Sequence, residues 1–146
     1  MISKSIKETK EIAKIFLDKI LRNNKKQKDA LVVALSGDLG AGKTVFTQAI
    51  GKHLGIKHKI TSPTFVIMKK YPIGKTYGVK FLIHIDAYRL KNEKELLNLG
   101  WKEIINNKDH LVFIEWPENV LKVIPKDARF VYISHKENGH RKLELK

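Results

Sequence analysis

The feature that most constrains this chain is a glycine-rich octapeptide, residues 37–44, which fits the pattern G-x-x-x-x-G-K-[ST] at every fixed position. Glycines let the backbone curl without Cβ clashes, so that successive N–H groups converge on phosphate oxygens. Lys43 would add positive charge beside the β- and γ-phosphates, and the Thr44 hydroxyl would ligate Mg²⁺. The octapeptide therefore predicts a nucleoside triphosphate site, formed by Gly37, Asp38, Leu39, Gly40, Ala41, Gly42, Lys43 and Thr44.

The segments on either side of the octapeptide fit this interpretation. Residues 30–35 are an uninterrupted apolar run, which is typical of a strand buried on both faces. After Lys43, apolar residues recur at helical spacing until Gly55, which is suited to end a helix. Strand, glycine loop and helix follow in the order that a phosphate site requires. The alternative is a glycine-rich turn that binds no ligand.

The length and composition restrict the class of protein. A chain of 146 residues is enough for one domain with its own core, so residues 1–146 are expected to form a single domain. No apolar run is long enough to span a membrane, and there is no cysteine for a disulfide or a thiolate zinc site. These observations favour a cytoplasmic protein without a membrane partner.

The charge is unusual, because 29 Lys and Arg residues against 15 Asp and Glu residues give a net charge of +14. A balance of this kind is typical of proteins that bind nucleic acid, and tRNA is one candidate. The excess is mostly lysine scattered along the chain, which is equally compatible with a lysine-rich composition alone.

Two apolar segments each end in a carboxylate. Residues 81–85 lead into Asp86, and residues 111–114 lead into Glu115. Ligands of open α/β sheets sit at the carboxyl ends of the strands, so both side chains are expected to face the glycine loop. One carboxylate would hold Mg²⁺ and the other would orient or deprotonate an attacking water, and the residues alone do not assign the two roles. His84 is expected to be a hydrogen-bonded structural group.

Two further helices are predicted from capping patterns. A capping box begins at Ser5, and apolar residues at helical spacing then predict about four turns, with the polar Thr9 on the surface. A similar box begins at Asn92 and predicts a helix that is broken at Gly100 and crosses over between parallel strands.

Turn chemistry predicts two hairpins. Residues 65–71 and 79–85 flank a segment with proline and glycine, and residues 129–146 fold back around 137–139. Together the elements predict an α/β fold like that of P-loop NTPases, a three-layer sandwich with a mixed, mainly parallel sheet and an antiparallel hairpin.

The segment before the first of these hairpins carries hydroxyl groups around a proline. Ser62 and Thr64 flank Pro63, which is compatible with a simple turn or with a switch loop that contacts a γ-phosphate.

Four blocks in this order resemble the TsaE (YjeE) family, small bacterial ATPases of tRNA threonylcarbamoyladenosine biosynthesis. They are residues 37–44, 62–65, 84–90 and 114–118. The resemblance implies an ATPase that uses ATP and Mg²⁺ and acts with a threonylcarbamoyl transferase and the inactive paralogue of that transferase. ATP hydrolysis would support repeated turnovers of the transferase.

The resemblance also implies roles for single residues. Thr44 and Glu115 would be the Mg²⁺ ligands, and Lys43 and Asp86 would complete the catalytic set. Nucleotide contacts are implied for the octapeptide and for three residues outside it, namely Thr9, Thr64 and Trp116. The segment 139–141 would lie near the base.

Two other functions remain open. A small nucleoside or nucleotide kinase would need arginines on a lid, whereas the four arginines of this chain are dispersed, with Arg89 the nearest to the predicted site. A basic nucleic-acid binding module without hydrolysis would instead show RNA binding that depends steeply on salt.

Overall fold

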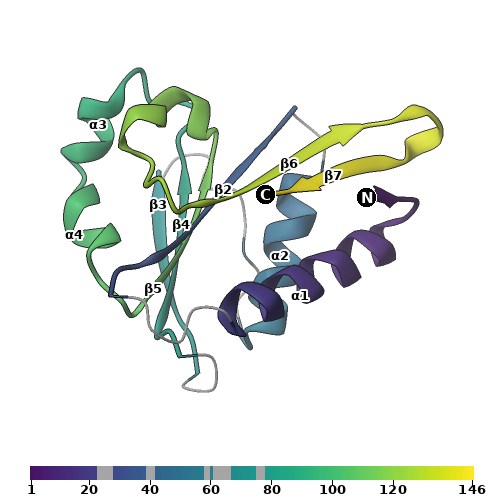
Figure 1. Cartoon of the computed structure of the whole chain (residues 1–146), viewed down its shortest axis with the longest axis horizontal. Helices are drawn as coiled ribbons and strands as arrows, with labels where there is room; N and C mark the ends of the chain where they lie inside the picture. The colour runs from purple at the N-terminus through teal and green to yellow at the C-terminus, as the bar shows by residue number, and fades with distance from the viewer. Residues whose placement is uncertain (23–27, 39–41, 58–59, 61–66, 75–77) are drawn as a thin grey trace.

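A computed structural model of the chain describes residues 1–22, 28–38, 42–57, 60, 67–74 and 78–146 (Figure 1). Within these residues, seven strands form one mixed sheet in the order β1-β7-β6-β2-β5-β4-β3. The strands are β1 (Ile2–Ser3), β2 (Leu31–Gly37), β3 (Met68–Pro72), β4 (Phe81–Asp86), β5 (His110–Glu115), β6 (Arg129–His135) and β7 (Arg141–Leu145). The helices are α1 (Ile6–Arg22), α2 (Lys43–His53), α3 (Glu93–Leu97) and α4 (Trp101–Ile105), with the 3₁₀ segments η2 (Pro117–Val123) and η3 (Glu137–Gly139).

The sheet is parallel at its centre and antiparallel at both edges. Strand β2 pairs in parallel with β5 and β6, and β5 pairs in parallel with β4. The edge pairs β3–β4, β6–β7 and β1–β7 are antiparallel. The predicted α/β class, the mixed sheet and both predicted hairpins are confirmed; parallel pairing is confined to the four central strands.

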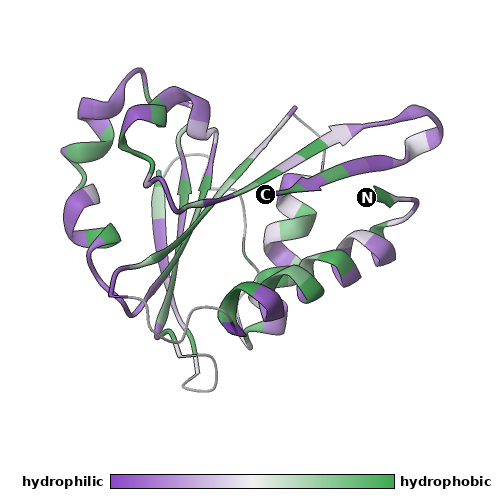
Figure 2. Ribbon diagram, viewed as in Figure 1, coloured by the Kyte–Doolittle hydropathy of each residue, from purple (hydrophilic) through white to green (hydrophobic). Residues whose placement is uncertain are grey.

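Strand β2 lies at the centre of the sheet, and its apolar run fills both layers of the core. Val33 and Leu35 belong to the cluster packed beneath α1 and α2, whereas Val32 and Ala34 belong to the cluster beneath α3, α4 and η2. Figure 2 shows the central strands in the green of apolar residues, between helices with mixed surfaces. Because successive side chains of a strand point to opposite faces, one apolar run serves both helical layers.

Helix α1 starts as its capping pattern predicts, with one difference. The Ser5 hydroxyl accepts a hydrogen bond from the Glu8 amide at 3.1 Å. The Glu8 carboxylate accepts one from the Lys4 amide at 2.7 Å, one residue before the usual partner. Strand β1 precedes the helix and was not predicted, because two residues carry no recognisable period.

The crossover helix is broken at the predicted place. Gly100 has a φ of 86°, in the left-handed region that favours glycine, and it separates α3 from α4. Trp101 then turns into the core, where its indole N–H donates to the Val123 carbonyl at 2.9 Å. In the β6–β7 turn, Asn138 and Gly139 both have positive φ, as the turn chemistry predicts. No helix within the described residues is long and apolar enough to cross a membrane.

Candidate functional site

Three neighbouring strands end together at one edge of the sheet. Strand β2 ends at Gly37, β4 at Asp86 and β5 at Glu115. Asp86 and Glu115 are register partners, and Leu35, two residues before Gly37, is the register partner of Glu115. The central position of β2 therefore brings both carboxylates beside the start of the glycine loop.

The two described ends of the glycine loop require residues without a side chain. Gly37 has a φ of 147°, and a Cβ there would lie 2.1 Å from the Ile133 carbonyl oxygen of the neighbouring strand β6. Gly42 has a φ of 102° and caps helix α2. A Cβ on Gly42 would lie 2.8 Å from Nε of Arg141. The loop therefore passes close to β6 at one end and to an arginine of β7 at the other.

Lys43 is a buried cation at the start of α2. Its side chain is 6% exposed, its ammonium donates to the Gly37 carbonyl at 2.7 Å, and Nζ lies 4.1 Å from the centre of the Trp116 ring. Burial lowers the pKa of the Lys43 ammonium, because an apolar environment disfavours the charged form. Four carboxylates act against that shift in the pKa, in decreasing order Glu115, Glu118, Asp86 and Asp38.

Glu115 is held by a histidine of the neighbouring strand. Nε2 of His84 lies 2.8 Å from Oε2 of Glu115, and both residues are buried, at 2% and 4% exposure. His84 is thus the hydrogen-bonded group that the sequence predicts. Nδ1 of His84 is buried without a hydrogen-bond partner among the described residues, so Nε2 makes the one polar contact that fixes this ring. With Nε2 protonated, the ring donates to one carboxylate oxygen and leaves the other for a ligand.

Asp86 and Trp116 shape the space beside this pair. Oδ1 of Asp86 accepts a hydrogen bond from the Tyr88 amide at 3.0 Å. The rings of Tyr88 and Trp116 lie 5.0 Å apart, and Trp116 itself has a φ of 57°, which is uncommon for a bulky residue. The Asn119 side chain donates to the Ala87 carbonyl at 2.9 Å and so fastens η2 to the end of β4. The Trp116 ring therefore contacts the Tyr88 ring and the Lys43 ammonium.

Thr9 lies in the core, not on the surface as its polar setting in the sequence predicts. It is fully buried, and its hydroxyl group lies 2.7 Å from that of Ser3 and 3.2 Å from the Ser5 carbonyl. The surface prediction was wrong because β1 folds back over the start of α1. Ser3 is also the register partner of Arg141, so Thr9 is linked through one residue to the arginine beside Gly42.

Arg141 and Glu118 lie at the site but were given no role of their own from the sequence, beyond the implied position of the segment 139–141 near the base. Nε of Arg141 is buried and has no hydrogen-bond partner among the described residues. Glu118 accepts a hydrogen bond from the Ser36 hydroxyl and adds to the negative field around Lys43. Each follows a recognisable signal, a turn before Arg141 and a strand end before Glu118, but only the strand order places them at one site.

Several predicted positions are outside the contacts just described. Asp38 follows β2 and is exposed, and Thr44 is exposed in the first turn of α2. Leu39, Gly40, Ala41 and Thr64 lie outside the described residues, as does the predicted switch around Ser62.

The oxygen ligands at this edge suit Mg²⁺. No group of three His, Cys, Asp or Glu side chains within the described part of the chain is placed to hold a metal ion by itself. Mg²⁺ is usually held by one or two carboxylates together with substrate phosphates and water, so it does not need such a group. The Thr44 hydroxyl and the second oxygen of Glu115 fit that mode of binding, and the buried, unpartnered Nε of Arg141 beside Gly42 fits an anionic ligand.

The fold and this edge of the sheet define an α/β protein like the P-loop NTPases. A family model described as "Threonylcarbamoyl adenosine biosynthesis protein TsaE" matches residues 3–143. The chain therefore belongs to the TsaE family and is a member of the group of proteins that function in tRNA threonylcarbamoyladenosine biosynthesis.

Individual relatives agree with the family model. The chain is 37% identical to the tRNA threonylcarbamoyladenosine biosynthesis protein TsaE of Rickettsia prowazekii, with 92% of each chain covered. It is 35% identical to the TsaE protein of Bacillus subtilis over 77% of this chain and 66% of that protein. The crystal structure of Bacillus subtilis YdiB covers 99% of this chain and 82% of the YdiB chain, with a TM-score of 0.73 and 28% sequence identity.

Proposed function

We propose that this chain binds and hydrolyses ATP with Mg²⁺, and that it does so together with a threonylcarbamoyl transferase and the inactive paralogue of that transferase. The observation that carries the proposal is the buried Lys43 at the start of α2, surrounded by carboxylates from the ends of β4 and β5. Among the described residues, the Lys43 ammonium donates to a carbonyl, lies over an aromatic ring and has no carboxylate in direct ion-pair contact, and a buried cation of this kind is expensive to retain unless a ligand uses it. Phosphate oxygens are the ligand that its position in the octapeptide indicates.

The metal and water roles follow from the two strand ends. Thr44 and Glu115 would hold Mg²⁺, which when bound neutralises charge on the phosphate oxygens. His84 keeps Glu115 in one orientation, because its ring nitrogen lies within hydrogen-bond distance of one carboxylate oxygen. Asp86, fixed by the Tyr88 amide, would orient the attacking water and accept its proton.

The opposite side of the loop is suited to the rest of the nucleotide. Arg141 presents a buried Nε against Gly42, where an anion or the polar edge of a base would satisfy it. Thr9 supports this strand through Ser3, and the contact of Thr9 with the nucleotide that the family resemblance implies stays a prediction. Trp116 covers Lys43 and would limit the access of water to the phosphates.

Isolated activity is expected to be weak. A group that stabilises the transferring phosphoryl, supplied or ordered by a partner protein, is worth roughly 10³ to 10⁵ in rate. The transferase and its paralogue are the partners that would supply or order such a group.

The proposal is tested by the steady-state rate of ATP hydrolysis. The purified chain and its Glu115→Ala variant are assayed alone and with the transferase and paralogue of the same organism. We expect a low rate that rises with the partners in the original chain and is lost in the variant. No hydrolysis by the original chain under either condition would overturn the proposal.

A further inference from the structure

A second concentration of positive charge lies away from the nucleotide site. Helices α1 and α2 and the segment after α2 enclose a groove of about 700 Å³. Its polar lining is rich in lysine: the described residues around it include Lys10, Lys14, Lys52 and Lys57, together with His53 and Gln48. No Asp or Glu is among the described residues that line this groove. We refer to it as the α1–α2 groove.

The carboxylates beside the groove neutralise only part of this charge. Glu11 lies 3.6 Å from Lys14, but both side chains are about half exposed, and exposed pairs of this kind contribute little. Asp18 contacts His53 at 3.0 Å. Lys52 and Lys57 are exposed and lie near the carboxyl end of α2. The groove is therefore a surface of net positive charge in a chain that carries +14 overall.

The shape and chemistry of the groove favour a phosphate backbone over bases. Ala49 and Ile60 form a buried aliphatic floor, and Gln48 is turned inward, donating to the Ile60 carbonyl at 2.8 Å. The described lining contains no Phe, Tyr or Trp side chain on which a base could stack, and its one imidazole, that of His53, contacts Asp18. Lysine is a flexible point charge that attracts phosphates without reading sequence. An acidic peptide would satisfy the lysines, but the floor offers few exposed apolar groups to anchor it.

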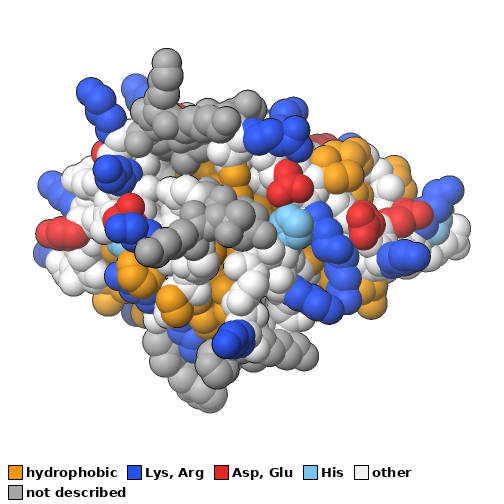
Figure 3. All heavy atoms as spheres, turned by 90° about the horizontal axis from the view of Figure 1, so that it is seen from below, with side chains coloured by type: hydrophobic (Ala, Val, Ile, Leu, Met, Phe, Trp, Pro, Cys, Tyr) orange, Lys and Arg blue, Asp and Glu red, His pale blue; other side chains and the backbone are white. Residues whose placement is uncertain are grey.

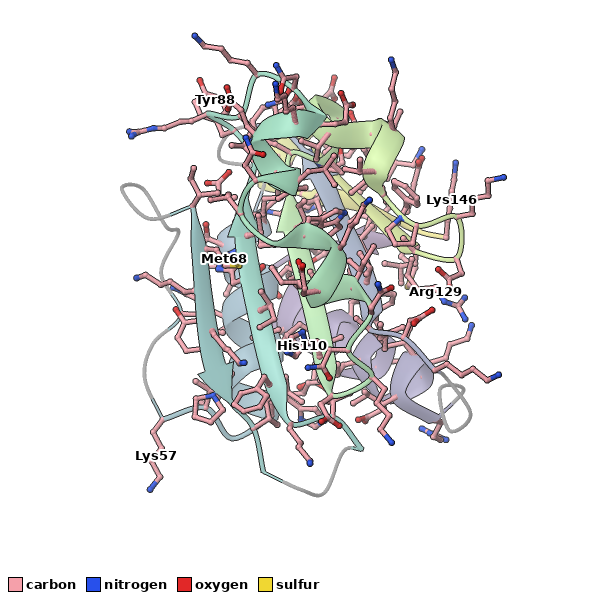
Figure 4. All side chains as sticks on the ribbon, turned by 90° about the vertical axis from the view of Figure 1, so that its left-hand side faces the viewer. Lys57, Met68, Tyr88, His110, Arg129 and Lys146 are labelled. Carbon is pink, nitrogen blue, oxygen red and sulfur yellow. The ribbon has the colours of Figure 1, made fainter. Side chains whose placement is uncertain are left out.

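The Lys57 end of the groove and the nucleotide site lie at opposite ends of the strands. Lys57 lines the groove and Tyr88 follows Asp86 in the site, and Figure 4 shows these two labelled residues at opposite ends of the strands. Figure 3, which looks onto the side of α1 and α2, shows a band of blue lysine and arginine side chains beside a pale blue histidine, with red carboxylates at its margins. A ligand in the groove would leave the nucleotide site accessible.

We propose that the α1–α2 groove binds the phosphate backbone of tRNA, without reading its sequence. The proposal depends on the family's role in tRNA modification but not on ATP hydrolysis by this chain. Each lysine that neutralises a phosphate releases counterions, so affinity must fall as salt rises. A surface that attracts RNA only through net charge would show the same salt dependence, so the groove is distinguished from it by variants that change the charge equally at different places.

The test compares two triple variants that change the net charge equally. The groove variant carries Lys10→Glu, Lys52→Glu and Lys57→Glu; the control carries Lys94→Glu, Lys102→Glu and Lys122→Glu, all exposed on α3, α4 and η2. Binding of fluorescently labelled, unfractionated tRNA is measured by anisotropy at several KCl concentrations. We expect the groove variant to bind roughly ten-fold or more weakly and its slope of log K against log[salt] to be shallower by about 2 to 3, because each lost phosphate contact removes about 0.7 to 0.9. The control variant should keep the slope of the original chain.

A Lys→Gln version of the groove triple removes charge without adding repulsion, and it should lower the slope to a similar extent. Equal losses of affinity in the groove and control triples would overturn the proposal in favour of net charge alone. Failure of the original chain to bind tRNA, or binding of poly-glutamate in its place, would also overturn it.

Binding of a fluorescent ATP analogue is followed in the same variants. If the original chain binds tRNA but not the ATP analogue, the proposed ATPase function is contradicted and the proposed tRNA binding by the groove is not.

Discussion

Two regions of this molecule use lysine in opposite ways. Lys43 is 6% exposed, lies against Trp116 and is surrounded by carboxylates from two strands. Lys52 and Lys57 stand in water at the rim of the α1–α2 groove. The buried cation has a lowered pKa and depends on its neighbours, whereas the exposed ones act by number and spacing. The difference teaches that the net charge of +14, which comes mostly from exposed lysines, says nothing of the charge balance around the buried Lys43.

The largest effect that would test this contrast is on hydrolysis. Lys43→Met should lower ATP hydrolysis by about 10²- to 10³-fold or more, the scale on which loss of one charge-stabilising group acts. Lys52→Met, the matched control in the groove, should leave the rate unchanged. Both are assayed with the partner proteins. Thermal melting should show no loss of stability in Lys43→Met, because an apolar side chain there replaces a buried charge. A rate within a few-fold of the original would contradict the role of Lys43.

The next effect concerns the support of Glu115. His84→Leu should raise the Mg²⁺ concentration needed for half-maximal hydrolysis by about 10- to 100-fold. Losses of metal affinity on this scale are typical when a group that orients a metal ligand is removed. His84→Gln keeps an N–H donor at a similar reach and should recover part of the loss. The measurement is a Mg²⁺ titration of the hydrolysis rate, with nucleotide binding without Mg²⁺ as the readout that should not move. Equal losses in the two variants would show that the ring serves packing alone.

The third effect is on stability, and it compares two glycines with positive φ. Gly37→Ala places a Cβ 2.1 Å from the Ile133 carbonyl, so the backbone of β2 or β6 must shift. A Cβ added to Gly55 would have no atom within 4 Å. Gly55→Ala therefore costs only the strain of its backbone conformation, about 1–2 kcal/mol. We expect Gly37→Ala to lower the free energy of unfolding by at least about 3 kcal/mol in urea titrations, at or above the upper end of the usual range for single substitutions. Similar losses in the free energy of unfolding for the two variants would show that strand β6 can move to accommodate the new Cβ at little cost.

The smallest expected effect is spectroscopic and separates the two ends of the molecule. The chain has two tryptophans, and Trp101 is buried away from Lys43. In a Trp101→Phe background, adding Mg²⁺ and ATP should change the emission of Trp116, because its ring lies 4.1 Å from the Lys43 ammonium. Adding tRNA without nucleotide should leave the emission unchanged. A response to tRNA alone would mean that the groove and the site are coupled or coincide.

Local patterns predicted much of the fold. The cap at Ser5, the break at Gly100 and the turn at Asn138 and Gly139 each rest on the conformational preferences of a few neighbouring residues, and the structure confirms them. Strand β1 and the burial of Thr9 were missed, because both depend on pairing with β7 at the far end of the chain. A strand of two residues is too short to show a recognisable alternation of apolar and polar residues.

The sequence by itself determined the chemistry of this protein: a glycine loop with Lys43 and Thr44, and strands that end in Asp86 and Glu115. These features are local, since residue type and spacing fix them. Only the tertiary structure decided which groups meet. The strand order places Glu115 against His84 and brings Arg141 to Gly42, across gaps of 31 and about 100 residues. The register of the paired strands and the crossover connections between them set these contacts, and both depend on segments that are far apart in the sequence.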